Sequence, residues 1–268
     1  MYIEEKYIQR ACRKACPNEY KDTEAYGDLS EYESLELFRY EKVREILRDG
    51  SSRESKIAIP AEHLMTIYVN GRKRLEVTCT GQYLAELILG RLLTEGFIGD
   101  AGDVESVRVN ESGKIGEVTL KVKDQSRQQA SECMPSVIKP VKWEKEWVFA
   151  LADRMAEGMP LHQKTFAVHS CFLSVGGELL FECEDIGRHN AFDKVIGYAL
   201  RSQVDLRRCI VYSSGRIPAD MAIKAVRAGI PVLAAKAVPT QEAVELAREY
   251  GLTLVCSARR DMLRVCAS

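Results

Sequence analysis

The hydrophobic pattern early in the chain predicts a β-hairpin followed by a helix. Residues 64–69 form an apolar, β-branched run that ends at an Asn-Gly pair, and apolar residues alternate with polar ones over residues 74–79. Asn-Gly favours a two-residue hairpin turn, because both central residues of that turn need positive φ. Over residues 84–92 apolar positions recur at three- and four-residue spacing, which predicts a helix with Thr80 as its N-cap.

The middle of the chain combines strand patterns with a polar stretch that contains prolines. Residues 104–109 and 115–122 predict a second pair of strands. The polar stretch 123–140 contains Cys133 in the sequence Cys-Met-Pro-Ser, and its prolines disfavour regular structure, so we expect Cys133 on a loop. Residues 144–158 carry apolar side chains on one helical face, which predicts a helix.

The C-terminal half changes to short apolar strands that alternate with helices. The pattern predicts a hairpin, a helix and then a βαβαβ unit, with strands at 167–175, 178–182, 209–212, 230–235 and 252–256 and helices at 190–200, 218–228 and 240–250. Continuous apolar strands of this kind are typical of parallel sheets that are covered on both faces. We therefore expect an α/β domain here.

Shifts in composition divide the chain into four expected parts. These are an N-terminal arm at residues 1–55, a β-hairpin and helix subdomain at 56–125, a loop carrying Cys133 at 126–143, and an α/β domain at 144–268. With 268 residues, 46% of them apolar, the chain is long enough to bury a full core.

Charge and cysteine content narrow the classes of function. The chain has 38 basic and 39 acidic side chains and a formal net charge of -1, so bulk attraction to nucleic acid or to an anionic membrane is not expected. Apolar runs are far shorter than the roughly 18 to 20 residues of a membrane span, and the default expectation is the cytoplasm. Nine scattered cysteines make a poor disulfide framework. Cys12 and Cys16 form only a weak metal or redox signal, because no second pair accompanies them.

The end of the first predicted parallel strand is a candidate anion site. In open α/β sheets ligands collect where strands end and helices begin, because free amide N–H groups and the helix dipole favour negative charge. Ser214, Gly215 and Arg216 occupy such a place, where the hydroxyl can donate, the glycine admits a ligand and the guanidinium can pair with phosphate. An ordinary strand-to-helix turn with an exposed arginine remains the alternative.

A dense polar segment precedes the helix expected at 190–200. Residues 184–190 include two acids together with Arg188, His189 and Asn190, a set that suits the binding of a polar ligand. A surface loop, with Asn190 as a helix cap, is the alternative. On the preceding strand His169 and Cys171 lie two residues apart and therefore point the same way, as a catalytic or as a buried pair.

The segment after the last parallel strand is the third candidate. It comprises Cys256, Ser257, Ala258, Arg259, Arg260 and Asp261, and it places two guanidinium groups at the same sheet end as Ser214. A solvated charge run is the alternative. For a nucleophilic thiol, loop placement favours Cys133, whereas Cys209 and Cys256 fall inside strands.

Together these residues resemble the formate dehydrogenase accessory sulfurtransferase family, FdhD. The resemblance rests on the segments 168–170, 184–190, 193–197, 214–216 and 237–240, and it extends to 68–71, 79–80 and 92–96. It covers about residues 56–268. No single segment is specific for the family, but the number of matching segments and their order along the chain are specific.

The resemblance implies a cytidine-deaminase-like, three-layer α/β/α C-terminal domain with a smaller β-rich α+β N-terminal subdomain. It implies a sulfur carrier in which Cys133 accepts persulfide sulfur from a cysteine desulfurase. The sulfur then passes to the molybdenum or tungsten bis-pterin guanine dinucleotide cofactor before that cofactor enters formate dehydrogenase. The cofactor's nucleotide end is expected on a homodimer, with His169, Arg188, His189, Ser214, Gly215, Arg216 and residues 256–261 as contacts.

The chain departs from the family at one position of the loop, and two other functions remain as alternatives. Many members carry Cys-x-x-Cys on the loop, whereas this chain has Ser136 at the second position, although one thiolate suffices to carry persulfide. The runner-up is a chaperone that binds the cofactor without transferring sulfur. A zinc hydrolase of the deaminase kind needs His-x-Glu and Pro-Cys-x-x-Cys, and the chain contains neither, so no metal site is expected.

Overall fold

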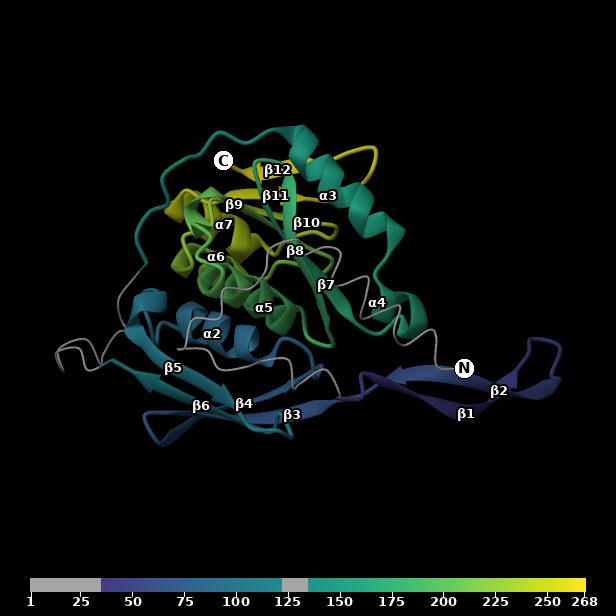
Figure 1. Cartoon of the computed structure of the whole chain (residues 1–268). Coiled ribbons are helices and arrows are strands. Elements are labelled where there is room, and N and C mark those ends of the chain that lie inside the picture. The colour runs from purple at the N-terminus through teal and green to yellow at the C-terminus, as the bar shows by residue number, and fades with distance from the viewer. Residues whose placement is uncertain (1–34, 122–134) are drawn as a thin grey trace.

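A computed structural model describes residues 35–121 and 135–268 of the chain (Figure 1). Cys12, Cys16, Cys133 and most of the predicted N-terminal arm lie outside the described residues. None of the described helices is long and apolar enough to span a bilayer.

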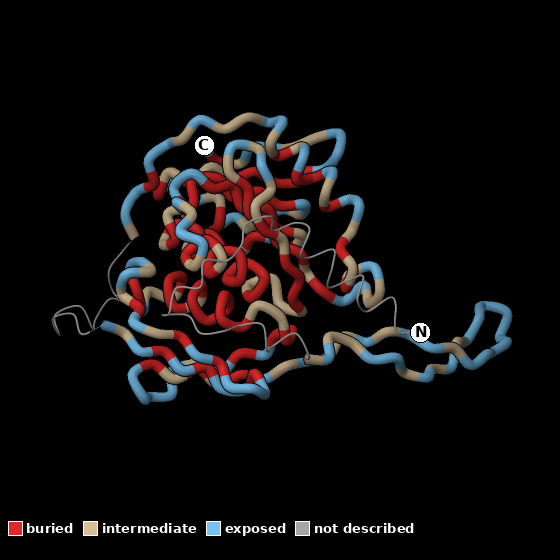
Figure 2. The backbone as a smooth tube through the Cα atoms, viewed as in Figure 1, coloured by how far each residue is buried: buried red, intermediate tan, exposed pale blue. Residues whose placement is uncertain are grey.

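The described chain begins with a two-stranded antiparallel ribbon. It consists of β1 (Phe38–Ile46) and β2 (Ser52–Pro60) and extends away from the body of the molecule (Figure 1). The boundary predicted between residues 55 and 56 falls inside β2. The hydrophobic pattern of the sequence does not predict these strands. Neither strand has a buried residue (Figure 2), so the alternation of apolar and polar residues that marks a strand with one buried face is absent.

A four-stranded sheet and one helix form the N-terminal subdomain. The sheet order is β4-β3-β6-β5, with β3 (His63–Val69), β4 (Arg72–Cys79), β5 (Val104–Val109) and β6 (Ile115–Leu120). The predicted hairpin turn is confirmed, since Asn70 and Gly71 both have positive φ, of 49° and 73°. Both predicted strand pairs are present.

The helix that follows, α2 (Leu84–Thr94), starts later than predicted. Its N-cap is Tyr83, and the assignment of Thr80 as the cap is wrong. Thr80 is fully buried, and its backbone N–H and hydroxyl both donate to Asp185, at 3.0 and 3.2 Å. Thr80 therefore binds a residue more than one hundred positions away, although the local pattern predicts that it caps a helix.

The C-terminal domain is built on a six-stranded sheet with the order β12-β11-β10-β9-β7-β8. Its strands are β7 (His169–Val175), β8 (Glu178–Asp185), β9 (Cys209–Ser213), β10 (Val232–Ala235), β11 (Thr253–Cys256) and β12 (Arg264–Ala267). The predicted parallel pairing of β9, β10 and β11 is confirmed. β7, β8 and β12 extend the sheet in antiparallel fashion.

Helices cover both faces of this sheet, which confirms the α/β fold class and its three layers. One face packs on α5 (Arg188–Arg201), α6 (Ala219–Arg227) and α7 (Gln241–Tyr250). The other face packs on α3 (Lys145–Glu157), whose Val148 and Leu151 lie against Phe172 and Tyr212. Both βαβ crossover helices share one face because right-handed connections that step in one direction along a sheet stay on one side.

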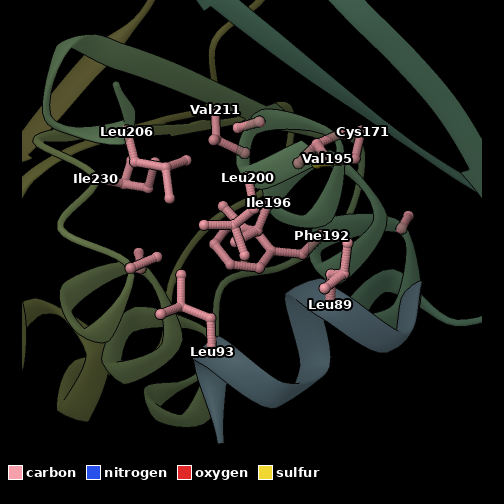
Figure 3. Packing of buried hydrophobic residues seen from close by; sticks show 14 of the residues in the cluster. Leu89, Leu93, Cys171, Phe192, Val195, Ile196, Leu200, Leu206, Val211 and Ile230 are labelled. Carbon is pink, nitrogen blue, oxygen red and sulfur yellow. The ribbon is translucent and has the colours of Figure 1, made fainter. Parts of the chain in front are cut away.

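The two subdomains share a single core between their sheets. Buried residues concentrate there, and the ribbon contributes none (Figure 2). In Figure 3, Leu89 and Leu93 of α2 face Phe192 and Ile196 of α5, with Val211 of the sheet beyond them.

Helices α2 and α5 approach so closely that their backbones touch. A Cβ on Gly90 would lie 1.8 Å from the carbonyl oxygen of Asp193, and a Cβ on Gly197 would lie 1.8 Å from that of Glu86. The crossing therefore requires glycine in both helices. Ion pairs bracket it, because Glu86 binds Arg201 at 2.7 Å and Asp193 binds Arg91 at 2.5 Å.

We expect Gly197→Ala to destabilise the protein by about 3 kcal/mol, since overpacking outweighs the roughly 1 kcal/mol that alanine adds in helix propensity. Urea unfolding measures this change. The control is Gly99→Ala, where a Cβ would meet its nearest neighbour at 3.5 Å, and its effect should stay within about 0.5 kcal/mol. Equal stability of the two variants would contradict a backbone contact between the helices.

Candidate functional site at the carboxyl edge of the sheet

Four predicted site residues come together where the strands end. His169 begins β7 and pairs with Asp185 at the end of β8, while Ser214 follows the end of β9. Because β7 runs antiparallel to β9, the start of β7 lies at the same edge as the end of β9. Arg188 begins α5 at this edge. We call His169, Arg188, Ser214 and Gly215 the rim.

Hydrogen bonds and close packing hold the rim together. The hydroxyl of Ser214 accepts the backbone N–H of Ser170 at 3.0 Å and lies 3.3 Å from Nδ1 of His169. A Cβ on Gly215 would lie 3.0 Å from Cδ of Arg188 and 3.4 Å from Nδ1 of His169. Glycine at this position therefore lets the arginine and histidine side chains converge on the loop after β9.

The rim offers a side-chain donor and the backbone N–H groups of a helix start, and neither has a side-chain partner within the described parts of the chain. Nε of Arg188 is buried and makes no hydrogen bond there. The start of α5 has Gly187 as its N-cap, no side-chain cap and no acidic residue in its first turn. Unpaired amide groups, the helix dipole and a guanidinium then act in the same direction, so the rim favours an anion with several oxygen atoms.

The local electrostatics make Arg188 the source of positive charge at the rim. Burial, and then the charge of Arg188, lower the pKa of His169 below its ordinary 6.5. His169 is therefore largely neutral at pH 7, when one ring nitrogen donates and the other accepts.

His189, although predicted with Arg188, lines a cavity beside α6, which also borders Gly187 at the start of α5. Its Nε2 lies 3.0 Å from Oδ2 of Asp220 on α6. The cavity has a volume of about 540 Å³ and lies between α2, the start of α5 and α6. Its charged lining includes Arg91, Lys224 and Arg227, which the sequence did not single out because they belong to different helices and form no local motif.

The acidic residues of segment 184–190 support the rim from inside the protein. Asp185 accepts Gly187 N–H at 2.9 Å and binds the fully buried Lys194 at 2.6 Å. Asn190 donates to Asp185 and to the carbonyl of Thr78, so it is not the cap of α5. These contacts fix the position at which α5 begins.

Glu184 anchors the short helix α4 (Pro160–Thr165) beside this edge. Its two carboxylate oxygens accept the backbone N–H groups of Leu161 and His162, at 2.8 and 2.7 Å. Burial raises the pKa of Glu184, although these two hydrogen bonds oppose the rise. The adjoining ribbon packs on α4, where Nζ of Lys164 lies 4.8 Å from the ring centroid of Phe38.

The third predicted segment has mainly structural contacts. Cys256, Ser257 and Ala258 are buried, and the carbonyl of Ala258 accepts the hydroxyl of Tyr212 at 2.6 Å. Arg260 pairs with Asp153 of α3 at 3.6 Å rather than with a rim residue. The remaining side chains, Arg259, Asp261 and Arg216 after β9, are exposed, and their role as cofactor contacts stays a prediction.

Comparison with known proteins identifies the family. The model of the FdhD/NarQ family matches residues 60–268. This chain belongs to the FdhD/NarQ family. Among curated relatives, "Sulfur carrier protein FdhD" of Geobacillus kaustophilus is 31% identical over 81% of this chain and 91% of its own. The protein of that name from Bacillus subtilis is 27% identical over 83% of this chain and 94% of its own.

A solved structure supports the same assignment. It is described as a putative formate dehydrogenase accessory protein from Desulfotalea psychrophila, and it matches with a TM-score of 0.75 and 27% identity. The match covers 87% of this chain and 97% of the other. The fold of this FdhD/NarQ protein is thus shared over nearly all of that relative.

The thiol predicted as the sulfur carrier, Cys133, lies outside the described residues. The chain beyond it is tied to the amino edge of the sheet, where Ile138 N–H donates to the carbonyl of Tyr250 at 2.8 Å. The rim lies at the opposite edge. His169 and Cys171 are predicted as either a catalytic or a buried pair. Cys171 is buried, and its burial raises the pKa of its thiol. Within residues 35–121 and 135–268, no three His, Cys, Asp or Glu side chains are arranged to hold a metal.

In the ligand-free FdhD/NarQ protein His169 should titrate below 6.5 in an NMR pH series. Arg188→Gln should raise this pKa without restoring the ordinary value, because burial is the larger cause. The lowered pKa means that folded His169 binds fewer protons than unfolded His169, so stability falls as the pH drops through the window below 6.5. Arg260→Gln is the control and should leave the titration unchanged. A value at or above 6.5 in the unmodified protein contradicts the assignment.

Proposed function

We propose that this FdhD/NarQ protein is a sulfurtransferase that carries sulfur as a persulfide on Cys133. It takes the sulfur from a cysteine desulfurase and passes it to a molybdenum or tungsten bis-pterin guanine dinucleotide cofactor, the substrate, for use by formate dehydrogenase. The observation that carries the proposal is the rim, where the unpaired Nε of Arg188 and the uncapped start of α5 meet. The names of the relatives support the same role.

The rim suits the diphosphate of a guanine nucleotide. Arg188 supplies a charged donor, and the free amide groups of α5 supply neutral ones. Ser214 adds a hydroxyl, and Gly215 keeps a Cβ out of the space next to Arg188. A nucleotide held here leaves the pterin and metal end of the substrate free to receive sulfur.

The burial of the described thiols supports Cys133 as the carrier. A persulfide carrier needs a thiolate that a partner protein can reach. Cys79, Cys171, Cys183, Cys209 and Cys256 are buried, and only Cys266 among the described cysteines is partly exposed. Burial raises the pKa of Cys79 and of Cys209 to about 12, which disfavours their thiolates.

The transfer requires one thiol at each step. The thiolate of Cys133 attacks the terminal sulfur of the persulfide on the desulfurase, a new S–S bond forms, and the desulfurase cysteine leaves as a thiolate. Ser136 in place of a second cysteine therefore does not prevent loading. We further propose that the protein acts in the cytoplasm as a homodimer.

Incubation with a cysteine desulfurase and cysteine should add the mass of one sulfur atom to the intact protein. Cys133→Ala should abolish this gain, because the attacking thiolate is absent, whereas Cys209→Ala should keep it, because Cys209 is buried at the amino edge. Full activation of formate dehydrogenase by Cys133→Ala would leave the cofactor-binding chaperone as the function.

Binding of guanosine diphosphate, measured by calorimetry, tests the rim. Arg188→Gln should weaken binding roughly 10- to 100-fold, since a charge-assisted hydrogen bond contributes about 1.5–3 kcal/mol. Arg207→Gln, whose guanidinium pairs with Asp205 before β9, is the matched control and should bind like the unmodified protein. If both variants bind equally well, the diphosphate does not bind at the rim.

A further inference from the structure

Two cysteines at one end of the sheet place their sulfur atoms in direct contact. Cys256 is the last residue of β11, Cys266 lies in β12, and their Sγ atoms are 2.7 Å apart. From the sequence, Cys256 is expected in the core or at the cofactor, and no role is expected for Cys266. Neither thiol carries sulfur in the transfer proposed above.

An irregularity in the strand pairing brings the two side chains together. Leu254 pairs with Ala267 and Val255 pairs with Val265, so the register passes over Cys266. This is the arrangement of a β-bulge, in which two residues of one strand face one residue of the other. Cys256 itself pairs with Arg264, and the bulge lets the side chain of Cys266 reach Cys256 across the two strands.

The two thiols differ in access. Cys256 is 4% exposed, whereas Cys266 is partly exposed in the C-terminal strand. Burial and the neighbouring Cys256 raise the pKa of Cys266 to about 12, while Arg248 of α7 and Arg264 of β12 act in the opposite direction. Cys266 is therefore the thiol that a small reagent meets first, and its thiolate fraction grows with pH.

We propose that Cys256 and Cys266 form a reversible disulfide by exchange with small disulfides of the glutathione disulfide class. The thiolate of Cys266 attacks one sulfur of the reagent, and the first small thiol leaves. Cys256 loses its proton and attacks the sulfur of Cys266, and the second small thiol leaves. Two protein thiols are oxidised, and one external disulfide is reduced to two thiols.

The bond encloses the segment that follows β11. This segment carries the exposed side chains of Arg259 and Asp261, and within it Arg259 N–H donates to the carbonyl of Met262 at 2.7 Å. Oxidation ties both ends of the segment together, since Cys256 precedes it and Cys266 follows it. The oxidation state of the pair therefore controls how freely this part of the carboxyl edge moves.

Peptide mapping of the full chain after treatment with glutathione disulfide tests the pair. Trypsin cuts after Arg248, Arg259 and Arg264, which leaves Cys256 in peptide 249–259 and Cys266 in peptide 265–268. Without reduction the two peptides should appear as one linked species, and a reductant should separate them. Its rate of formation should rise roughly tenfold per pH unit between pH 7 and 9, because the attacking thiolate increases.

Two variants and a thermal measurement complete the test. Cys266→Ser should remove the linked species, whereas Cys209→Ala, altered at the opposite edge, should retain it. The oxidised protein should also melt about 5 °C higher than the reduced protein, a shift that Cys266→Ser lacks. The inference is overturned if both peptides stay unlinked and fully alkylatable, or if Cys256 is found linked to a different cysteine.

Discussion

The backbone contact between α2 and α5 is the constraint on which the rest of the structure depends. Gly90 and Gly197 allow the two helices to touch, and a single methyl group at either position would collide with a carbonyl oxygen. Each helix carries one of the two sheets on its other side, so their crossing makes one core from two subdomains. The buried pairs of Asp193 with Arg91 and Lys224 lie beside the crossing, where an unpaired charge would be expensive.

The same contact positions the candidate site. Lys194 of α5 reaches Thr80 and Asp185, and Asp185 in turn holds the N–H of Gly187, directly before α5 begins. Because these groups are buried and satisfied, the first turn of α5 has one fixed position relative to β8 and β9. The donors of Arg188 and of the helix start remain available to a ligand.

The rim and the chain that follows the Cys133 segment lie at opposite edges of one sheet. The rim occupies the carboxyl edge, whereas Ile138, the first buried residue after the segment that contains Cys133, is bonded to Tyr250 at the amino edge. The thiols between these edges are mostly buried, and burial keeps them protonated. Cys256 and Cys266, whose Sγ atoms are 2.7 Å apart, lie on the outer strands β11 and β12, beside the exposed segment at the carboxyl edge.

The sequence by itself determined the elements whose signals are local, such as the Asn70-Gly71 hairpin, the parallel strands and the strand end at Ser214. Periodicity and turn chemistry act over a few residues, and the direction of each strand determines the edge of the sheet at which that strand ends. Only the tertiary structure decided that Thr80 binds Asp185 instead of capping a helix and that Arg91 and Arg227 line one cavity. These partners lie more than one hundred residues apart, and the burial that selects them exists only after the two subdomains have packed together.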